Sequence, residues 1–207
     1  MTRIDADVLR RLPKAELHCH LDGSVRPETL LELGREHRQP MPATDAESLA
    51  EYMRVDDAKN LEDYLMRFDV TLSVMQTAEA LERIAYELAM DAARDGVRYI
   101  ETRFAPVLNT RRGLSLAEAV QAPLRGLTRG EREGGAMGRV IVTALRNLSP
   151  EVSMELARLA VDYRHEGVVA FDLAGAEAGN PASVHAAAFA YVREHDLACT
   201  CHAGEGD

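Results

Sequence analysis

Residues that can bind a metal ion lie in two short segments near opposite ends of the chain. His18 and His20 are two positions apart in an apolar run, so on a β-strand their side chains point to the same face. Two imidazoles on one face can bind zinc, which takes at least three protein ligands. His202 ends another apolar run and is the candidate third ligand. The alternative interpretation is a purely structural pair of histidines.

The segment around His202 also holds a candidate catalytic group. Glu205 lies just past the predicted strand, where a carboxylic acid could donate a proton beside a metal-bound water. Cys199 and Cys201 could instead form a Cys/His zinc cluster with His202. The pleat of a strand puts the cysteines on the face opposite the histidine, so we expect both to be small core residues.

Two more features complete the set of candidate polar groups. Small residues in the segment 171–177 leave room for a flat ligand, to which Gly175 could present a bare backbone N–H. Glu101 and Arg103 alternate on another predicted strand, and we expect them to form a buried ion pair inside the fold. The other histidines are expected at the surface or at helix ends; they are His37, His165, His185 and His195.

Short β-rich runs alternate with longer stretches of helical spacing. The predicted strands are Ala15–His20, Val97–Phe104, Arg139–Leu145, Val168–Leu173 and Ala198–His202. This alternation predicts βα units and a parallel sheet, either an open doubly wound sheet or part of a barrel. Neither of the glycine-rich nucleotide-binding motifs, G-x-G-x-x-G and G-x-x-x-x-G-K-[ST], follows the first strand, and this counts against the open sheet. Residues 40–96 are too many for one crossover and predict extra helices at one end of the sheet.

Several helix boundaries are marked by capping residues or by proline in the first turn. The predicted starts are Pro27, Thr77, Ser115, Ser149–Pro150 and Asn180–Pro181. Ser115 and Glu118 have the spacing of a capping box. Pro123 and Gly126 fall inside the helix that begins there, and they predict a kink or a break.

The composition is that of a globular protein of 207 residues, 46% hydrophobic and 28% charged. A net charge of −10 disfavours nonspecific binding to nucleic acids and anionic membranes. The three cysteines lack a disulfide framework, and the sequence has neither a signal-peptide pattern nor an apolar run near 18 residues. We therefore expect a cytoplasmic protein whose partner is neither a nucleic acid nor a membrane.

Four segments carry distinctive motifs, in order along the chain. The first is residues 12–24 (LPKAELHCHLDGS), followed by the PETL of residues 27–30. The others are residues 99–106 (YIETRFAP), 171–175 (FDLAG) and 202–205 (HAGE). Together they resemble the adenosine deaminase family of the amidohydrolase superfamily. Four ordered motifs are far more specific than any one of them.

The resemblance implies an α/β fold, a (β/α)₈ TIM barrel of the amidohydrolase type, with one zinc ion per subunit. It implies that His18, His20 and His202 bind zinc, that His20, Asp22 and Gly175 contact the substrate, and that Glu205 donates a proton to the purine. The implied reaction is hydrolysis of adenosine, and of 2′-deoxyadenosine, to inosine and ammonia in purine salvage. Glu205 must be protonated to donate, so we expect burial to raise its pKa.

The resemblance is partial, because the family also uses a histidine on a sixth strand and an Asp-Asp pair on an eighth. Neither has a counterpart up to Asp207, and a barrel of this type needs ~250 residues. We therefore expect residues 1–207 to be one C-terminally incomplete deaminase domain with five strands and extra helices between the first two. Alone, it should have an open edge at the fifth strand, an incomplete zinc shell and a tendency to aggregate.

The sequence is also compatible with other functions. Deaminases of adenine, 6-aminodeoxyfutalosine and N6-methyl-AMP share most of these motifs, although the Asp22 carboxylate favours a nucleoside without a 5′-phosphate. A noncatalytic purine-binding fragment is the alternative outside enzymes. The unrelated zinc nucleobase deaminases are disfavoured because their H-x-E and P-C-x-x-C motifs are absent.

Overall fold

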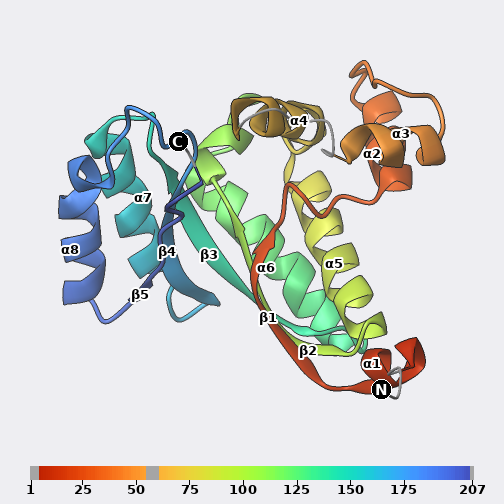
Figure 1. Ribbon diagram of the computed structural model, residues 1–207. Helices are drawn as coiled ribbons and strands as arrows, with labels where there is room; N and C mark the ends of the chain where they lie inside the picture. Colours follow the sequence, from red (N-terminus) through yellow and green to blue (C-terminus); the bar gives the residue numbers. More distant parts are fainter. Residues whose placement is uncertain (1–4, 55–60, 206–207) are drawn as a thin grey trace.

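The computed structural model describes residues 5–54 and 61–205, and a parallel five-stranded sheet lies at its centre (Figure 1). The strands lie in sequence order and are β1 (Lys14–His20), β2 (Val97–Phe104), β3 (Met137–Leu145), β4 (Val168–Ala174) and β5 (Ala198–Cys199). One face of the sheet is covered by α5 (Ala78–Arg94), α6 (Leu116–Arg132), α7 (Pro150–Asp162) and α8 (Ala186–Glu194).

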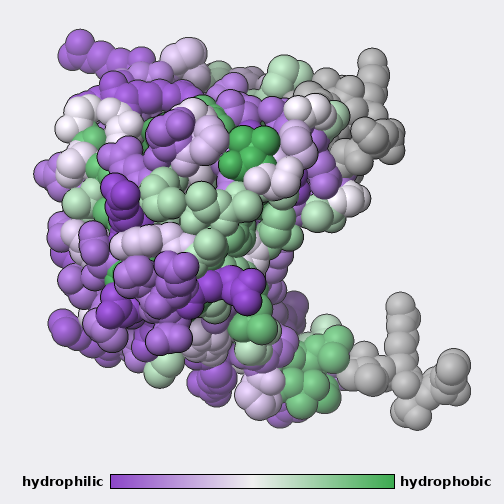
Figure 2. All heavy atoms as spheres, turned by 90° about the vertical axis from the view of Figure 1, so that its left-hand side faces the viewer, coloured by the Kyte–Doolittle hydropathy of each residue, from purple (hydrophilic) through white to green (hydrophobic). Residues whose placement is uncertain are grey.

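The strand order decides between the two predicted architectures. A doubly wound sheet reverses its strand order and carries helices on both faces. Here the order β1-β2-β3-β4-β5 has no reversal, and the long crossover helices lie on one face, which is the pattern of a (β/α) barrel. Seen from the α8 side, the molecule is hollowed on one face, and hydrophobic groups border the hollow (Figure 2).

The extra helices predicted between the first two strands are present. They are α2 (Pro27–Glu36), α3 (Ala46–Met53) and α4 (Leu61–Val74), and they gather near the carboxyl ends of the strands, while α1 (Ala6–Arg11) lies at the other end (Figure 1). Pro27 is the first residue of α2, and the Thr77 side chain caps α5 by accepting a hydrogen bond from the amide of Ala80, both as predicted. None of the described helices is long and apolar enough to cross a membrane.

The last strand is shorter than predicted. Regular β-structure covers only Ala198–Cys199 rather than Ala198–His202. Pairing with β4 nevertheless continues. The amides of Thr200 and His202 donate hydrogen bonds of 2.9 Å to the carbonyls of Phe171 and Leu173, respectively. β5 is the last strand in the order and pairs only with β4 among the described strands, so one row of hydrogen bonds holds this segment.

Of the kink or break predicted in α6, the break does not occur, because one helix runs through Pro123 and Gly126. Its start is the predicted capping box of Ser115 and Glu118. The glycine serves close packing instead: a Cβ at Gly126 would lie 2.1 Å from the carbonyl oxygen of Glu82 on α5. Glycine here therefore marks the place where α5 and α6 touch.

The segment before α8 also differs from its prediction. Asn180 does not cap a helix; its side-chain amide donates to the carbonyls of Ala176 and Ala178, and a short 3₁₀ helix, η2 (Ala182–His185), precedes α8. His185 lies at a helix end, one of the two places predicted for it, but it is buried rather than at the surface, at 1% exposed. Its Nδ1 lies 2.8 Å from the Ser153 hydroxyl, so burial is compensated by hydrogen bonding.

Gly126→Ala should destabilise the protein by about 1–3 kcal/mol, because the new methyl group would overlap the backbone of α5. Gly34→Ala is the matched control, since a Cβ there meets only the flexible side chain of Met41. Urea unfolding of both variants measures the difference. Equal stabilities would mean that α5 and α6 are not packed as described.

Candidate functional site

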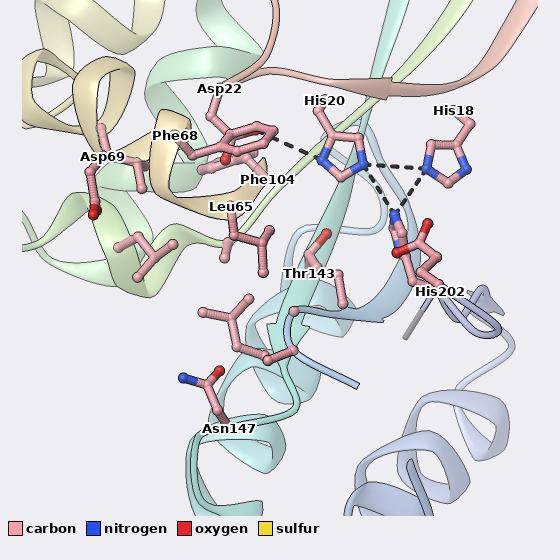
Figure 3. Close-up of a pocket in the computed structure, with 18 of the residues that line it drawn as sticks. His18, His20, Asp22, Leu65, Phe68, Asp69, Phe104, Thr143, Asn147 and His202 are labelled. Atoms are coloured by element: carbon pink, nitrogen blue, oxygen red, sulfur yellow. Dashed lines mark hydrogen bonds and ion pairs between the residues drawn. The ribbon is translucent and has the colours of Figure 1, made fainter. Parts of the chain in front are cut away.

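Three imidazoles meet at the carboxyl end of the sheet (Figure 3). The Nε2 atoms of His18 and His20 are 3.3 Å apart, and the Nε2 atom of His202 lies 2.9 Å from the first and 3.1 Å from the second. His18 is exposed, His20 half-buried and His202 buried. The structure thus brings together the three histidines that the sequence singled out, although 184 positions separate His18 from His202.

This arrangement fits a metal ion better than it fits three histidines alone. Each ring nitrogen is either a donor or an acceptor, so three nitrogens in mutual contact cannot form three donor–acceptor pairs. A cation between them resolves the conflict, because all three lone pairs can point to it. Ligand nitrogens around tetrahedral zinc lie about 3.3 Å apart, close to the separations here. The donor set therefore fits a metal such as zinc.

The alternation of β1 and the pairing of β5 with β4 place these rings. His18 and His20 lie two residues apart on β1, and the backbone of His202 is bonded to β4. The predicted Cys/His alternative is not formed among the described residues, where the only candidate metal cluster is the three histidines. Cys199 packs against the core as expected, but Cys201 is exposed, with its sulfur 3.7 Å from Nη2 of Arg146.

A buried carboxylate stands behind the histidines. Asp172 on β4 is fully buried, and its Oδ2 lies 3.1 Å from Nδ1 of His202 and 3.3 Å from Nη1 of Arg103. Its other oxygen accepts a 2.8 Å hydrogen bond from the Thr200 hydroxyl, and the Thr143 hydroxyl lies 3.3 Å from Oδ2. A carboxylate on the far nitrogen of a metal-binding histidine fixes the ring and raises its basicity.

This network corrects one prediction. Arg103 is buried, as expected, but its ionic partner is Asp172 rather than Glu101, whose carboxylate accepts a hydrogen bond from the Tyr99 hydroxyl. Partners across a sheet depend on register, which alternation along one strand does not give. A signal for Asp172 was nevertheless present, since it is the one charged residue in the apolar strand Val168–Ala174.

The local charges move the pKa values of the histidines apart. Burial, followed by the neighbouring His202 and His18, lowers the pKa of His20 to about 4. Burial and the nearby Arg103 lower the pKa of His18 as well. Asp172 has the opposite effect on His202 and raises its pKa. Burial alone would raise the pKa of Asp172, but His202, Thr200 and Arg103 bring it to about 2.

A cavity of about 600 Å³ opens beside the imidazoles, and all the predicted site residues line it. Asp22 is 8% exposed, and burial raises its pKa to about 6. Gly175 adopts a left-handed backbone with φ +94°, which glycine adopts without strain. Glu205 is exposed rather than buried as expected. The cavity therefore combines the candidate metal ligands with acidic side chains from three segments, which are Asp22, Asp69 and Glu205.

The opposite wall of the cavity is apolar and was not found from the sequence. It is formed by α4, the end of β2 and the short η1 helix (Pro106–Asn109), through Leu65, Phe68, Leu72, Phe104 and Leu108. The rings of Phe68 and His20 are neighbours, with centroids 6.2 Å apart and planes tilted by 59° (Figure 3). A helical stripe of such residues has the same sequence pattern as an ordinary core face, so periodicity could not distinguish them.

Comparison with known proteins agrees with this architecture. Solved structures with the same fold include adenine deaminase from Arthrobacter aurescens (27% identity, TM-score 0.81, covering 92% of this chain and 57% of that one). Another is an amidohydrolase from Burkholderia ambifaria with bound zinc (25% identity, TM-score 0.83, 98% and 56%). The fold is thus that of the amidohydrolase TIM barrels, over part of their chains.

Sequence comparison shows to which family within this fold the chain belongs. Residues 13–207 match the adenosine deaminase family. Similar proteins include an adenosine deaminase of Mycobacterium avium, 47% identical over 98% of this chain, and a probable adenosine deaminase of Dictyostelium discoideum, 44% identical over 98%. The chain belongs to the adenosine deaminase family. It spans 57% of the length of the first relative and 26% of the second.

Arg103→Met should cost about 3–5 kcal/mol of stability, because it leaves the Asp172 carboxylate buried without its cation. The double variant Arg103→Met/Asp172→Leu should cost less than the sum of the two single changes. Urea unfolding in the absence of metal measures this coupling. The exposed pair of Arg125 and Glu82 is the control, with a coupling of about 1 kcal/mol or less. Additive effects at Arg103 and Asp172 would contradict the network.

Proposed function

We propose that this chain carries the zinc-binding and purine-binding part of a hydrolytic deaminase that converts adenosine, and 2′-deoxyadenosine, to inosine and ammonia. The observation that carries the proposal is the convergence of His18, His20 and His202 at the edge of a cavity that also presents Glu205. Family membership supports the reaction class. Because the chain spans 57% of its bacterial relative, we propose that the complete site also uses residues outside this chain.

In this proposal the chain's own residues bind and orient the substrate. The apolar wall around Phe68 excludes water from one side of a flat purine, and the backbone N–H of Gly175 donates to a ring nitrogen. Asp22 accepts a hydrogen bond from a ribose hydroxyl. Glu205, beside the histidines, holds the proton that moves to the purine ring. Zinc, when bound by the three histidines, supplies Lewis-acid activation of the attacking water.

The proposed substrate differs from the substrates and ligands named for several solved relatives of this chain. Solved relatives include an N6-methyl-AMP deaminase from Arabidopsis (28% identity, TM-score 0.83) and complexes named for IMP and GMP. A nucleoside monophosphate would bring its phosphate into a cavity where, besides the proton donor Glu205, two carboxylates (Asp22 and Asp69) face one guanidinium (Arg111), so that repulsion outweighs attraction. A nucleoside without a phosphate is therefore the better match for this cavity.

A panel of 6-aminopurines tests the substrate. Adenosine and 2′-deoxyadenosine should be deaminated with kcat/KM at least about tenfold above adenine, AMP and N6-methyl-AMP, a difference of about 1.4 kcal/mol in transition-state binding. Ammonia release from the zinc-loaded protein, expressed from its complete coding sequence, measures the rates. A preference for AMP or adenine would keep the reaction and refute the substrate. No turnover of any member would favour a purine-binding protein without catalysis.

Removing one imidazole tests the metal site separately. Loss of a residue that supports a metal ligand lowers metal affinity by about 10–100-fold. His20→Ala and His202→Ala each remove a proposed ligand itself, so each should lower zinc affinity by more than that. His165→Ala, an exposed histidine far from the cluster in sequence, is the control and should retain one zinc per chain. Elemental analysis after dialysis gives the metal content without an activity assay. Unchanged zinc in both cluster variants would refute this site.

A further inference from the structure

The segment that carries His202 and Glu205 is held by an arginine and a glutamate that follow two other strands. Arg146 is the first residue after β3, and Glu177 lies in the loop after β4. The segment itself has no regular structure after Cys199. Side-chain contacts must therefore supply much of what fixes its backbone beyond the two hydrogen bonds to β4.

Arg146 reaches across two loops from a buried position. Its side chain is 4% exposed, and Nη2 donates a 2.6 Å hydrogen bond to the carbonyl of His202. Nη1 donates to the carbonyl of Asn180 over 3.0 Å. The Arg146 backbone is fixed as well, because its amide donates to Ala174 and its carbonyl lies 3.1 Å from Nε2 of the buried His185. The backbone that carries the guanidinium is therefore fixed by hydrogen bonds.

Glu177 extends this contact to the candidate proton donor. One carboxylate oxygen lies 3.5 Å from Nη2 of Arg146, and the other accepts a 2.9 Å hydrogen bond from the backbone amide of Glu205. The carboxylate is 25% exposed, so water only partly screens these interactions. A charged acceptor on a backbone amide is among the stronger hydrogen bonds in proteins.

We propose that Arg146 and Glu177 form a positioning bridge that sets where Glu205 stands relative to the three histidines. Arg146 donates a hydrogen bond to the carbonyl of His202, and Glu177 accepts one from the amide of Glu205. The ion pair between Arg146 and Glu177 joins these two contacts. The proposal rests on the proposed function, in which Glu205 donates the proton. Neither Arg146 nor Glu177 is among the residues that line the cavity, so both would act through Glu205.

Substitution of Glu177 tests the bridge, because this side chain is partly exposed and its loss leaves the core intact. Glu177→Ala removes the acceptor of the Glu205 amide and the ion pair with Arg146, whereas Glu177→Gln keeps an oxygen for the Glu205 amide. In the zinc-loaded protein, expressed from its complete coding sequence, Glu177→Ala should lower kcat for adenosine by about 10–100-fold with KM within about threefold. Glu177→Gln should recover most of kcat. Glu155→Ala, an exposed change on α7, is the control.

Hydrogen exchange gives a second readout that does not depend on catalysis. The amide of Glu205 should exchange at least about tenfold faster in Glu177→Ala than in the wild type or Glu177→Gln, while zinc stays at one per chain. If the protein deaminates nothing and this amide still loses protection, the bridge stands and the proposed function fails. Unchanged protection and unchanged kcat, or a loss of zinc parallel to the loss of kcat, would overturn the bridge.

Discussion

One buried carboxylate, that of Asp172, links the strands of the sheet. The Asp172 carboxylate is fully enclosed, and a carboxylate in that position is stable only with cations and hydrogen-bond donors around it. The partners come from β2 (Arg103), from β3 (Thr143) and from the segment after β5 (Thr200 and His202). Arg103 in turn donates to the carbonyl of Leu17 on β1. A single network of ion pairs and hydrogen bonds therefore reaches four strands and the segment after the fifth, and it ends at a candidate metal ligand.

The same network marks the limit of what the sequence could predict. Alternation along β1 correctly placed His18 and His20 on one face, and the position of His202 at a strand end correctly predicted its approach to them. Arg103 was assigned the wrong partner, because its neighbour on β4 depends on how the strands are shifted against each other. Local patterns give the facing of a side chain; they do not give its contacts across the sheet.

Two other differences have the same origin in tertiary contact. Pro123 and Gly126 weaken an isolated helix, yet α6 stays continuous because α5 packs closely against Gly126. His185 looked like an ordinary helix-end residue, and only the fold shows the Ser153 hydroxyl beside it. The helix starts at Pro27, Thr77 and Ser115 were correctly predicted because caps act within a few residues.

The sheet order also has a consequence during synthesis. Each strand pairs with the one made just before it, so the sheet can grow strand by strand as the chain leaves the ribosome. His18 and His202 are 184 positions apart, which at ordinary translation speeds separates their appearance by about 10–40 s. Throughout that interval the nascent chain exposes two imidazoles without the third. An ion captured by the finished triad would then fasten the first strand to the last and stabilise the assembled sheet against reopening.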